Sequence, residues 1–516
     1  MCKRTLTPWY KGPVRGRQQA LGSRQVLARP RVRFRRAAGW PGVLVVAWAV
    51  GCSSPKGPES CLVSSEECPT GTFCDAISQR CISESLRDVE RCRLPIDCPD
   101  AARPLCQDGV CRACTQITEI KASDQACLSL GQPFLRICVR SGPRKGQCGE
   151  CRASGECSDP QRPVCIDGLC RACQQHSECS ESGVCNDGSG LIDVPGVDVG
   201  HCVPSEQVVF VDVARCPSGG SGAVGSHEKP FCELSSAAGK GPLIAIAARM
   251  SGTYAAAAFS DGKRSVVVGP GRDGSALLSA VTATGMRTAV TLIDVALTGT
   301  GTALSCTAGA QLRLLRGSVV GSAASGGTSI DAQGCDRLDI SESKVARSKG
   351  AALRIGSGTR SYRIVSSLFY DNAGPSAIRM AAGTAGLFVG NTLINNGAQG
   401  TDGGAVFCEG SAALHDSLIV QNGRSLRTDG MGNPLGTQFL GSCVLNNIVV
   451  GIDAAGVSGK GIPAIPDLDN LFQLRDTPNN EACCIDQALL CEGEADFFGN
   501  RRKQGERCDI GAHELR

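Results

Sequence analysis

The residues whose type and spacing are best suited to chemistry are the cysteines. The chain of 516 residues contains 32 of them, and 20 lie between residues 61 and 202. Thiols at this density can coordinate a metal, exchange electrons or form disulfides. Three pairs have the spacing of a zinc knuckle, namely Cys111 and Cys114, Cys148 and Cys151, and Cys170 and Cys173.

Two observations favour disulfides over the other two chemistries. Only His176 and His201 lie in this segment, so histidine ligands for a metal are scarce. No βαβ pattern surrounds any of the CxxC pairs, as a thioredoxin-like redox site requires. We therefore expect no metal, and we expect disulfides that form in an oxidising compartment.

The cysteine-rich segment, residues 61–206, is built from internal repeats. The spacing x5, x7, x4, x2 occurs twice, in Cys92, Cys98, Cys106, Cys111 and Cys114 and again in Cys151, Cys157, Cys165, Cys170 and Cys173. An Asp-Gly pair between two cysteines of each copy predicts a tight turn. Units this small bury little apolar surface, so disulfides worth about 2–4 kcal/mol each must stabilise them. The segment resembles the EGF-like or Dickkopf-like cysteine-rich repeats of bacterial surface proteins.

The remaining disulfide candidates lie further along the chain, at Cys216, Cys232, Cys306, Cys335, Cys408, Cys443, Cys483, Cys484, Cys491 and Cys508. We expect Cys306 to bond Cys335 and Cys408 to bond Cys443, either between adjacent turns of a repeat or within loops.

The N-terminus predicts export. Residues 1–51 contain eleven basic residues and no acidic one, and an apolar run at 43–50 precedes Gly51-Cys52. A basic stretch, a short apolar run and small residues before a cleavage point are typical of a signal peptide. Ala49-Val50-Gly51-Cys52 resembles the lipobox of bacterial lipoproteins, which implies a signal peptide at 1–51, lipidation at Cys52 and a lipidated tether at 52–60. The alternative is an ordinary signal peptide.

The predicted signal peptide and lipidation site determine the expected location of the protein and the charge of its mature part. A serine directly after the lipidated cysteine, as at Ser53, resembles the sequence of lipoproteins of the outer membrane. We therefore expect a protein that is anchored in the outer membrane by its lipid and is either periplasmic or surface-exposed. Its partner is then the membrane. Beyond residue 51 the chain contains 42 basic and 49 acidic residues. This mildly acidic balance does not favour nucleic acid as a partner.

Residues 207–475 show a repeat of a different kind. Short alternating segments align on one apolar position per repeat, at Leu297, Val319, Val345, Leu368, Leu393 and Leu418, with spacings of 22, 26, 23, 25 and 25 residues. A further segment at 447–450 continues the series. This period, without a helical stripe, predicts one strand-bearing turn of a solenoid per repeat. A leucine-rich repeat has a similar period, but its fixed leucine and asparagine pattern is absent.

The entry to this region carries a specific resemblance. A strand-like run at 208–213, Lys229-Pro230-Phe231, Ile244 to Ala247, Gly252-Thr253-Tyr254 and Val266 to Gly269 follow in order. This order resembles the start of right-handed parallel β-helices of the pectate-lyase-like group, with a short helix after the Lys-Pro-Phe stretch. The expected fold class is therefore all-β, a right-handed parallel β-helix preceded by a disulfide-rich, loop-rich stalk.

Three asparagines follow the strands of successive repeats. We expect Asn372, Asn396 and Asn422 to stack as an interior ladder at one turn. Gly374, Gly397 and Gly423 follow them and would take the left-handed bends.

Residues 476–516 are expected to cap the β-helix. Their Cys-Ile-Asp at 484–486 and Cys508-Asp509-Ile510-Gly511-Ala512-His513-Glu514 resemble the closing segment of choice-of-anchor bacterial surface proteins. A cap would cover the open edge of the last turn. Its carboxylates, Asp486, Asp496, Asp509 and Glu514, suggest calcium as one possible ligand. The favoured interpretation is a solvated cap with carboxylates paired to Arg501, Arg502 and Arg507, and no cofactor.

The repeats offer little for catalysis. Polysaccharide lyases and hydrolases on this fold need clustered carboxylates, and the Asp-Asp pair that hydrolases use is absent. Asp371, Asp402 and Asp416 would have to converge from successive turns. We predict no catalytic residues and a surface protein whose β-helix binds a glycan or a protein. A polysaccharide lyase or hydrolase and a structural envelope component are the alternatives.

Overall fold

The computed structural model describes most of the chain from residue 72 onward. The described residues are 72–75, 80–83, 92, 94, 97–107, 110–132, 134–159, 161–179, 181–192, 194–217, 220–247, 253–260, 262–271, 277–321, 327–397, 405–410, 412–420, 422, 439–441, 443–450, 458–463, 466–493, 495–502 and 507–515. The predicted signal peptide, the tether and Cys52 lie outside them. None of the helices in these ranges has the length and apolar character to cross a membrane.

The cysteine-rich segment consists of small hairpins joined by disulfides. Its strands pair antiparallel in four hairpins, β1 (Thr72–Asp75) with β2 (Arg80–Ser83), β3 (Leu105–Gln107) with β4 (Val110–Arg112), β5 (Ile137–Cys138) with β6 (Cys148–Gly149), and β7 (Val164–Ile166) with β8 (Leu169–Arg171). One helix, α1 (Ile120–Leu128), lies between the second and third hairpins.

The disulfides repeat as the sequence does. In both copies the first cysteine bonds the third and the second bonds the fourth, giving Cys92–Cys106 with Cys98–Cys111 and Cys151–Cys165 with Cys157–Cys170. Among the described residues of this segment, the further bonds are Cys114–Cys138, Cys127–Cys148, Cys173–Cys185 and Cys179–Cys202. Disulfide bonding of this segment is thus confirmed.

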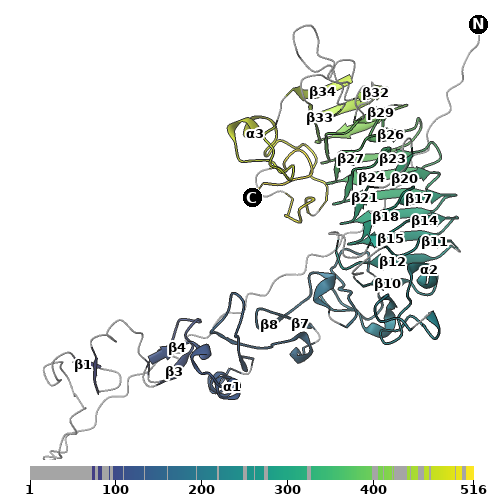
Figure 1. Cartoon of the computed structure of the whole chain (residues 1–516). Coiled ribbons are helices and arrows are strands. Elements are labelled where there is room, and N and C mark those ends of the chain that lie inside the picture. The colour runs from purple at the N-terminus through teal and green to yellow at the C-terminus, as the bar shows by residue number, and fades with distance from the viewer. Residues whose placement is uncertain are drawn as a thin grey trace, which may run out of the picture. The chain divides into compact units, whose positions relative to one another are not determined.

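The predicted parallel β-helix is also confirmed. Most turns contribute one strand to each of three parallel sheets, in which strands pair from one turn to the next along the solenoid (Figure 1). The first sheet is β11 (Ala257–Phe259), β14 (Val281–Thr284), β17 (Leu304–Thr307), β20 (Thr328–Gln333), β23 (Ala351–Ile355), β26 (Ile378–Met380), β29 (Val406–Cys408) and β32 (Phe439–Gly441).

The other two sheets follow in each turn. The second is β9 (Val209–Val211), β10 (Leu243–Ile246), β12 (Arg264–Val268), β15 (Ala289–Ile293), β18 (Gln311–Leu315), β21 (Arg337–Ser341), β24 (Ser361–Val365), β27 (Gly386–Val389), β30 (Ala413–His415), β33 (Val444–Val450) and β34 (Ser458–Pro463). The third is β13 (Leu277–Leu278), β16 (Ala296–Leu297), β19 (Ser318–Val320), β22 (Lys344–Ala346), β25 (Leu368–Tyr370), β28 (Thr392–Ile394) and β31 (Leu418–Val420).

A sharp bend separates the second and third sheets. The bend lies between β15, which ends at Ile293, and β16, which begins at Ala296, because Asp294 takes a left-handed conformation with φ 54°. Arg316, Glu342 and Ser366 occupy the same position in the next three turns, with φ between 50° and 52°. A residue in the left-handed region bends the backbone sharply and ends a strand. The alternation of apolar and polar side chains in the sequence therefore did not locate the break.

The pairing corrects the predicted alignment at two positions. Val345 pairs with Phe369 rather than Leu368, and Leu393 pairs with Ile419 rather than Leu418. A slip of one residue reverses the face to which a side chain points. Phe369 and Ile419 therefore lie in the interior core, whereas Leu368 and Leu418 face outward against the C-terminal segment.

The predicted asparagine ladder is present in the interior. Nδ2 of Asn372 donates to Oδ1 of Asn396 at 2.8 Å, and Nδ2 of Asn396 donates to Oδ1 of Asn422 at 2.9 Å. The expectation for the glycines is only partly correct. Gly397 is left-handed with φ 99°, Gly374 is not, and Gly423 lies outside the described residues.

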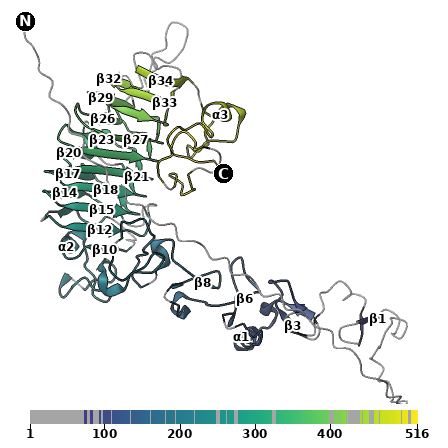
Figure 2. The same ribbon diagram turned by 180° about the vertical axis from the view of Figure 1, so that it is seen from behind.

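The C-terminal segment does not cap the last turn as expected. Residues 466–515, which include α3 (Pro478–Cys483), pack along the side of the third sheet, as both views of the ribbon show (Figures 1 and 2). They cover outward-facing apolar side chains of β25, β28 and β31, including Leu368, Ile394 and Leu418. The need to bury these side chains accounts for the lateral position. At the other end, the short helix α2 (Leu234–Ala237) packs Leu234 into the first turns.

Candidate functional site

A cluster of arginines lies on the outward face of the second sheet. The strand register places Thr291, Arg313, Asp339 and Arg363 side by side in four successive turns. Asp339 is therefore bracketed by arginine on both sides along one column of the sheet. Arg337, at the start of β21, reaches the same carboxylate from its own strand.

The three guanidinium groups surround Asp339 without making close hydrogen bonds to it. Nε of Arg313 lies 3.3 Å from Oδ2, Nη2 of Arg337 lies 3.5 Å from Oδ2, and Nη1 of Arg363 lies 3.6 Å from Oδ1. The Asp339 side chain is only 2% exposed. Ser341 donates its hydroxyl to Oδ1 at 2.8 Å and accepts from Arg363 at 2.9 Å.

Two buried atoms in this cluster lack a hydrogen-bond partner. They are Nε of Arg313 and Oδ2 of Asp339, which face each other at an ion-pair distance without the alignment of a hydrogen bond. Burial lowers the pKa of Arg313, and the Asp339 carboxylate acts in the opposite direction. Buried polar atoms without partners are rare in native proteins and indicate a site where a ligand or water completes the bonding.

Two adjoining cavities open over this cluster, and together we call them the binding groove. One has a volume of about 330 Å³ and the other about 280 Å³, and both are lined by Leu191, Arg313, Arg337 and Asp339. The larger extends to Arg363, Gly493 and Ala495, and the smaller extends to Arg264. The groove thus follows the sheet from β12 to β24, roughly 19 Å at ~4.8 Å per strand.

One wall of the groove comes from the last cysteine unit, residues 173–202. Leu191 of this unit packs in a cluster with Ile293 and Leu315 of the sheet. Its carbonyl oxygen accepts a hydrogen bond from Nη2 of Arg264 at 3.0 Å. Asp187 and Ser189 line the larger cavity. The unit is therefore part of the site rather than only a spacer.

A second ion-pair network ties this unit to the β-helix. Arg316 donates Nε and Nη2 to the carboxylate of Asp294 at 2.9 and 3.0 Å, and its Nη2 lies 3.6 Å from Asp187. Burial opposes the charge of Arg316, but the hydrogen bond to Asp294 and the nearby carboxylates raise its pKa. The buried ring of His176 lies against this pair, with Nε2 3.8 Å from Asp294.

His176 itself is held in one orientation by the backbone. Its Nδ1 accepts the N–H of Cys185 at 3.1 Å, and its side chain is 3% exposed. Burial lowers the pKa of His176, and Asp294 opposes the shift. His176 is therefore neutral where it packs between the last cysteine unit and the β-helix.

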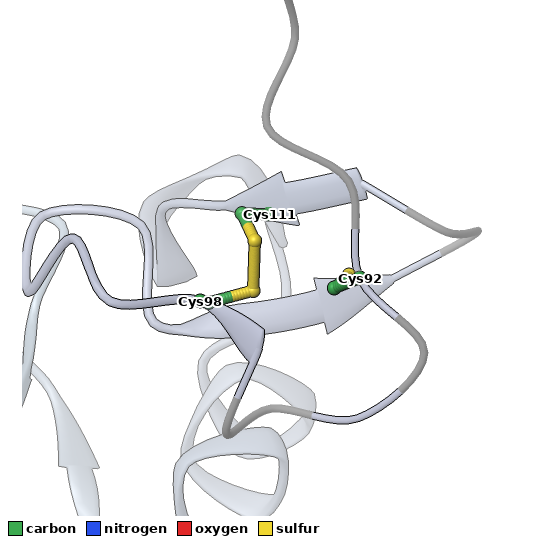
Figure 3. Close-up of side chains that lie close together, drawn as sticks. All are labelled: Cys92, Cys98 and Cys111. Carbon is green, nitrogen blue, oxygen red and sulfur yellow. A yellow bond between two sulfur atoms is a disulfide. The ribbon is translucent and has the colours of Figure 1, made fainter. Parts of the chain in front are cut away.

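The zinc-knuckle spacings do not form metal sites. Within the part of the chain that the structure describes, four groups of three cysteines have sulfurs close enough together for a metal, and every member is disulfide-bonded. Figure 3 shows the first group, in which Cys98 bonds Cys111 beside Cys92. Metal binding needs free thiolates. In each CxxC pair the two cysteines bond different partners, so no redox-active CxxC exists among these pairs.

The C-terminal carboxylates are buried rather than solvated as expected. Asp496, Asp509 and Glu514 are at most 2% exposed and accept backbone N–H groups, for example Asp496 from Asn500 at 2.7 Å and Asp509 from Leu515 at 2.7 Å. Arg502 lies 3.6 Å from Glu514. The hydrogen bonds of these carboxylates to backbone N–H groups hold the segment in its fold.

The carboxylates suggested to converge are Asp371, Asp402 and Asp416. Asp371 follows β25 and Asp416 follows β30, two different bends of the turn, while Asp402 lies outside the described residues. Asp416 is 1% exposed and accepts the N–H groups of Leu489 and Leu490 at 2.8 Å each. It anchors the C-terminal segment.

The sequence interpretation missed the arginines of the groove. Arg313, Arg337 and Arg363 lie on β18, β21 and β24, strands of three consecutive turns, with their side chains at the outward face. That placement was a usable signal, since outward charged side chains on neighbouring turns lie close together on one face of the sheet. A scan against family models, a search of curated proteins and a search of solved structures each found no match.

Proposed function

We propose that the chain is a lipoprotein of the outer membrane, anchored through Cys52, which displays its β-helix to bind an anionic glycan or surface protein. The observation that carries this proposal is the arginine cluster around the buried Asp339 in a groove on an outward sheet face. Arginine recognises oxyanions through paired, planar N–H donors.

The charge balance of the groove supports an anionic ligand. Its lining contains five arginines, at 264, 313, 316, 337 and 363, and three carboxylates, Asp187, Asp339 and Glu342. This formal excess of two positive charges contrasts with the acidic balance of the chain beyond residue 51. A local positive stripe on an acidic protein attracts anions at close range.

The location rests on the residues around Cys52. A basic leader, an apolar run and a small-residue site before Cys52 support acylation, and the EGF-like cysteine repeats would separate the β-helix from the bilayer. A lipid anchor with two or three acyl chains holds a protein stably at a membrane. The closing segment of the choice-of-anchor type fits an envelope protein.

The rival proposal is a polysaccharide lyase or hydrolase that uses the same groove. The test incubates the purified full-length protein with acidic and neutral polysaccharides, with and without calcium. We expect retention of acidic polymers without new unsaturated or reducing ends. The appearance of such ends would replace binding with catalysis, and no retention of any polymer would favour a structural envelope component.

A further inference from the structure

We propose that the cluster of Arg313, Arg337 and Arg363 around Asp339 binds a phosphate group that retains a proton, and that it discriminates against sulfate. The group is either inorganic phosphate or a phosphomonoester carried by a larger molecule. This inference rests on the proposed function, because it names the chemical group that the binding groove recognises.

The arginines supply the donors for such a group. Each guanidinium carries five N–H donors. Within the cluster, these three side chains make one hydrogen bond, from Arg363 to Ser341. Nε of Arg313 is buried beside Asp339 and makes no hydrogen bond. The side chains of Arg313, Arg337 and Arg363 are 32%, 55% and 25% exposed, so their remaining donors are accessible from the groove.

Asp339 supplies the opposite function, an acceptor. A carboxylate accepts hydrogen bonds and repels an anion, so its position at the centre of an anion site needs an explanation. Oδ1 accepts the hydroxyl of Ser341, and the buried Oδ2 accepts no hydrogen bond, although it forms ion pairs with Arg313 and Arg337 at 3.3 and 3.5 Å. A ligand that bonds Oδ2 must donate a hydrogen to it.

Protonated phosphate combines both properties. Its unprotonated oxygens accept from guanidinium groups, and its O–H donates to a carboxylate. Sulfate has the same shape and accepts equally well, but at neutral pH it carries no proton to donate. Leaving Oδ2 unpaired against an anion costs about 1–3 kcal/mol, which converts to roughly tenfold or more in affinity.

Asp339 is therefore the residue that sets specificity, and the arginines set affinity. In the Asp339→Asn variant the amide replaces one acceptor by a donor and removes one negative charge. The variant should accept sulfate as readily as phosphate. The Arg337→Gln variant should weaken both anions, and it should fold because Arg337 is the most exposed of the three and makes only an ion pair at 3.5 Å.

The experiment is titration calorimetry of the full-length protein with sodium phosphate, sodium sulfate, glucose 6-phosphate and glucuronate. A pH of about 6 is chosen because the second pKa of a phosphomonoester is about 6, so a large fraction retains its proton. Arg379→Gln is the matched control. Arg379 lies on β26, a strand of the first sheet, where it is 54% exposed and pairs with Glu409. Circular dichroism and mass spectrometry without reductant check the fold and disulfides of each variant.

We expect phosphate to bind roughly tenfold or more tightly than sulfate, Asp339→Asn to abolish this preference, and Arg379→Gln to change nothing. Binding of glucose 6-phosphate as well as phosphate would indicate a phosphomonoester on a larger ligand, and binding of inorganic phosphate alone would indicate the free ion. Equal affinity for sulfate in the wild type, or tighter binding of glucuronate than of phosphate, would overturn the inference. If acidic polymers bind through the groove and phosphate does not, only the inference fails; if no anion binds, the proposed function fails with it.

Discussion

Nε of Arg313 lies 3.3 Å from Oδ2 of Asp339, and neither buried atom makes a hydrogen bond. The two residues are neighbours in the register of β18 and β21, so the backbone of the β-helix fixes their separation. A rigid sheet that holds donors and an acceptor in place reduces the entropy lost when a ligand binds. This relationship is the structural basis for assigning the binding function to this face.

Leu191 should be needed for the shape of the groove. Leu191→Ala removes a side chain that is 5% exposed and packs on Ile293 and Leu315. We expect a loss of about 2–5 kcal/mol in the stability of the packed interface. Limited proteolysis should then cleave residues 173–202 earlier than in the wild type. Val199→Ala, at a side chain that is 66% exposed, is the control. Equal cleavage rates for Leu191→Ala and the wild type would show that the unit is held by other contacts.

Asn396 should stabilise the middle of the β-helix. Its side chain accepts from Asn372 and donates to Asn422 and to the carbonyl of Phe369 at 2.8–2.9 Å. Asn396→Ala removes hydrogen bonds from buried groups on three neighbours, at about 0.5–1.5 kcal/mol for each bond. Chemical denaturation should give a lower midpoint than in the wild type, while Asn470→Ala at an exposed position should change stability by ~0.5 kcal/mol or less. An unchanged midpoint for Asn396→Ala would mean that the ladder is energetically neutral.

The interface of the last cysteine unit should weaken in acid. The pKa of His176 is lowered in the folded protein, so the unfolded chain binds more protons as the pH falls below about 6.5. Stability should therefore be full above that pH and decrease below it. His176→Asn keeps an acceptor for the N–H of Cys185 and removes the titration, so its melting temperature should fall less between pH 7 and pH 5. Parallel curves for variant and wild type would refute this role of His176, and His201→Asn serves as the control.

Acylation at Cys52 should decide where the protein is found. Cys52→Ala removes the thiol that carries the lipid, so the protein should move from the membrane fraction to the soluble fraction. The mass of the mature N-terminal peptide checks the same point directly. A wild-type protein with an unmodified N-terminus would contradict the lipoprotein interpretation.

The sequence was most informative where a pattern repeats. The period near 24 residues predicted the β-helix, and the duplicated cysteine spacing matches duplicated bonds. The sequence was least informative where a single position decides which side of a strand faces the core, as at Leu368 and Phe369. Both residues are apolar, so the pattern does not distinguish them. Leu368 faces outward because it packs against the C-terminal segment. That segment carried a recognisable motif, but its lateral position depends on which outward side chains need cover.

The groove could be predicted only in part. The arginines stand at outward positions of adjacent turns, a feature that the sequence does contain. The packing of Leu191 against a sheet face more than 100 residues away depends on tertiary contacts with Ile293 and Leu315 and has no local signal.

Binding of anions by the arginine groove is tested most directly by comparing how tightly two arginine variants bind an immobilised acidic polysaccharide. Arg337→Gln in the groove and Arg379→Gln on β26 remove the same charge at similar exposure. We predict that the full-length wild type and Arg379→Gln bind alike, that Arg337→Gln binds roughly tenfold more weakly, and that salt weakens binding by the wild type. Equal loss in both variants, or no loss in either, would contradict it.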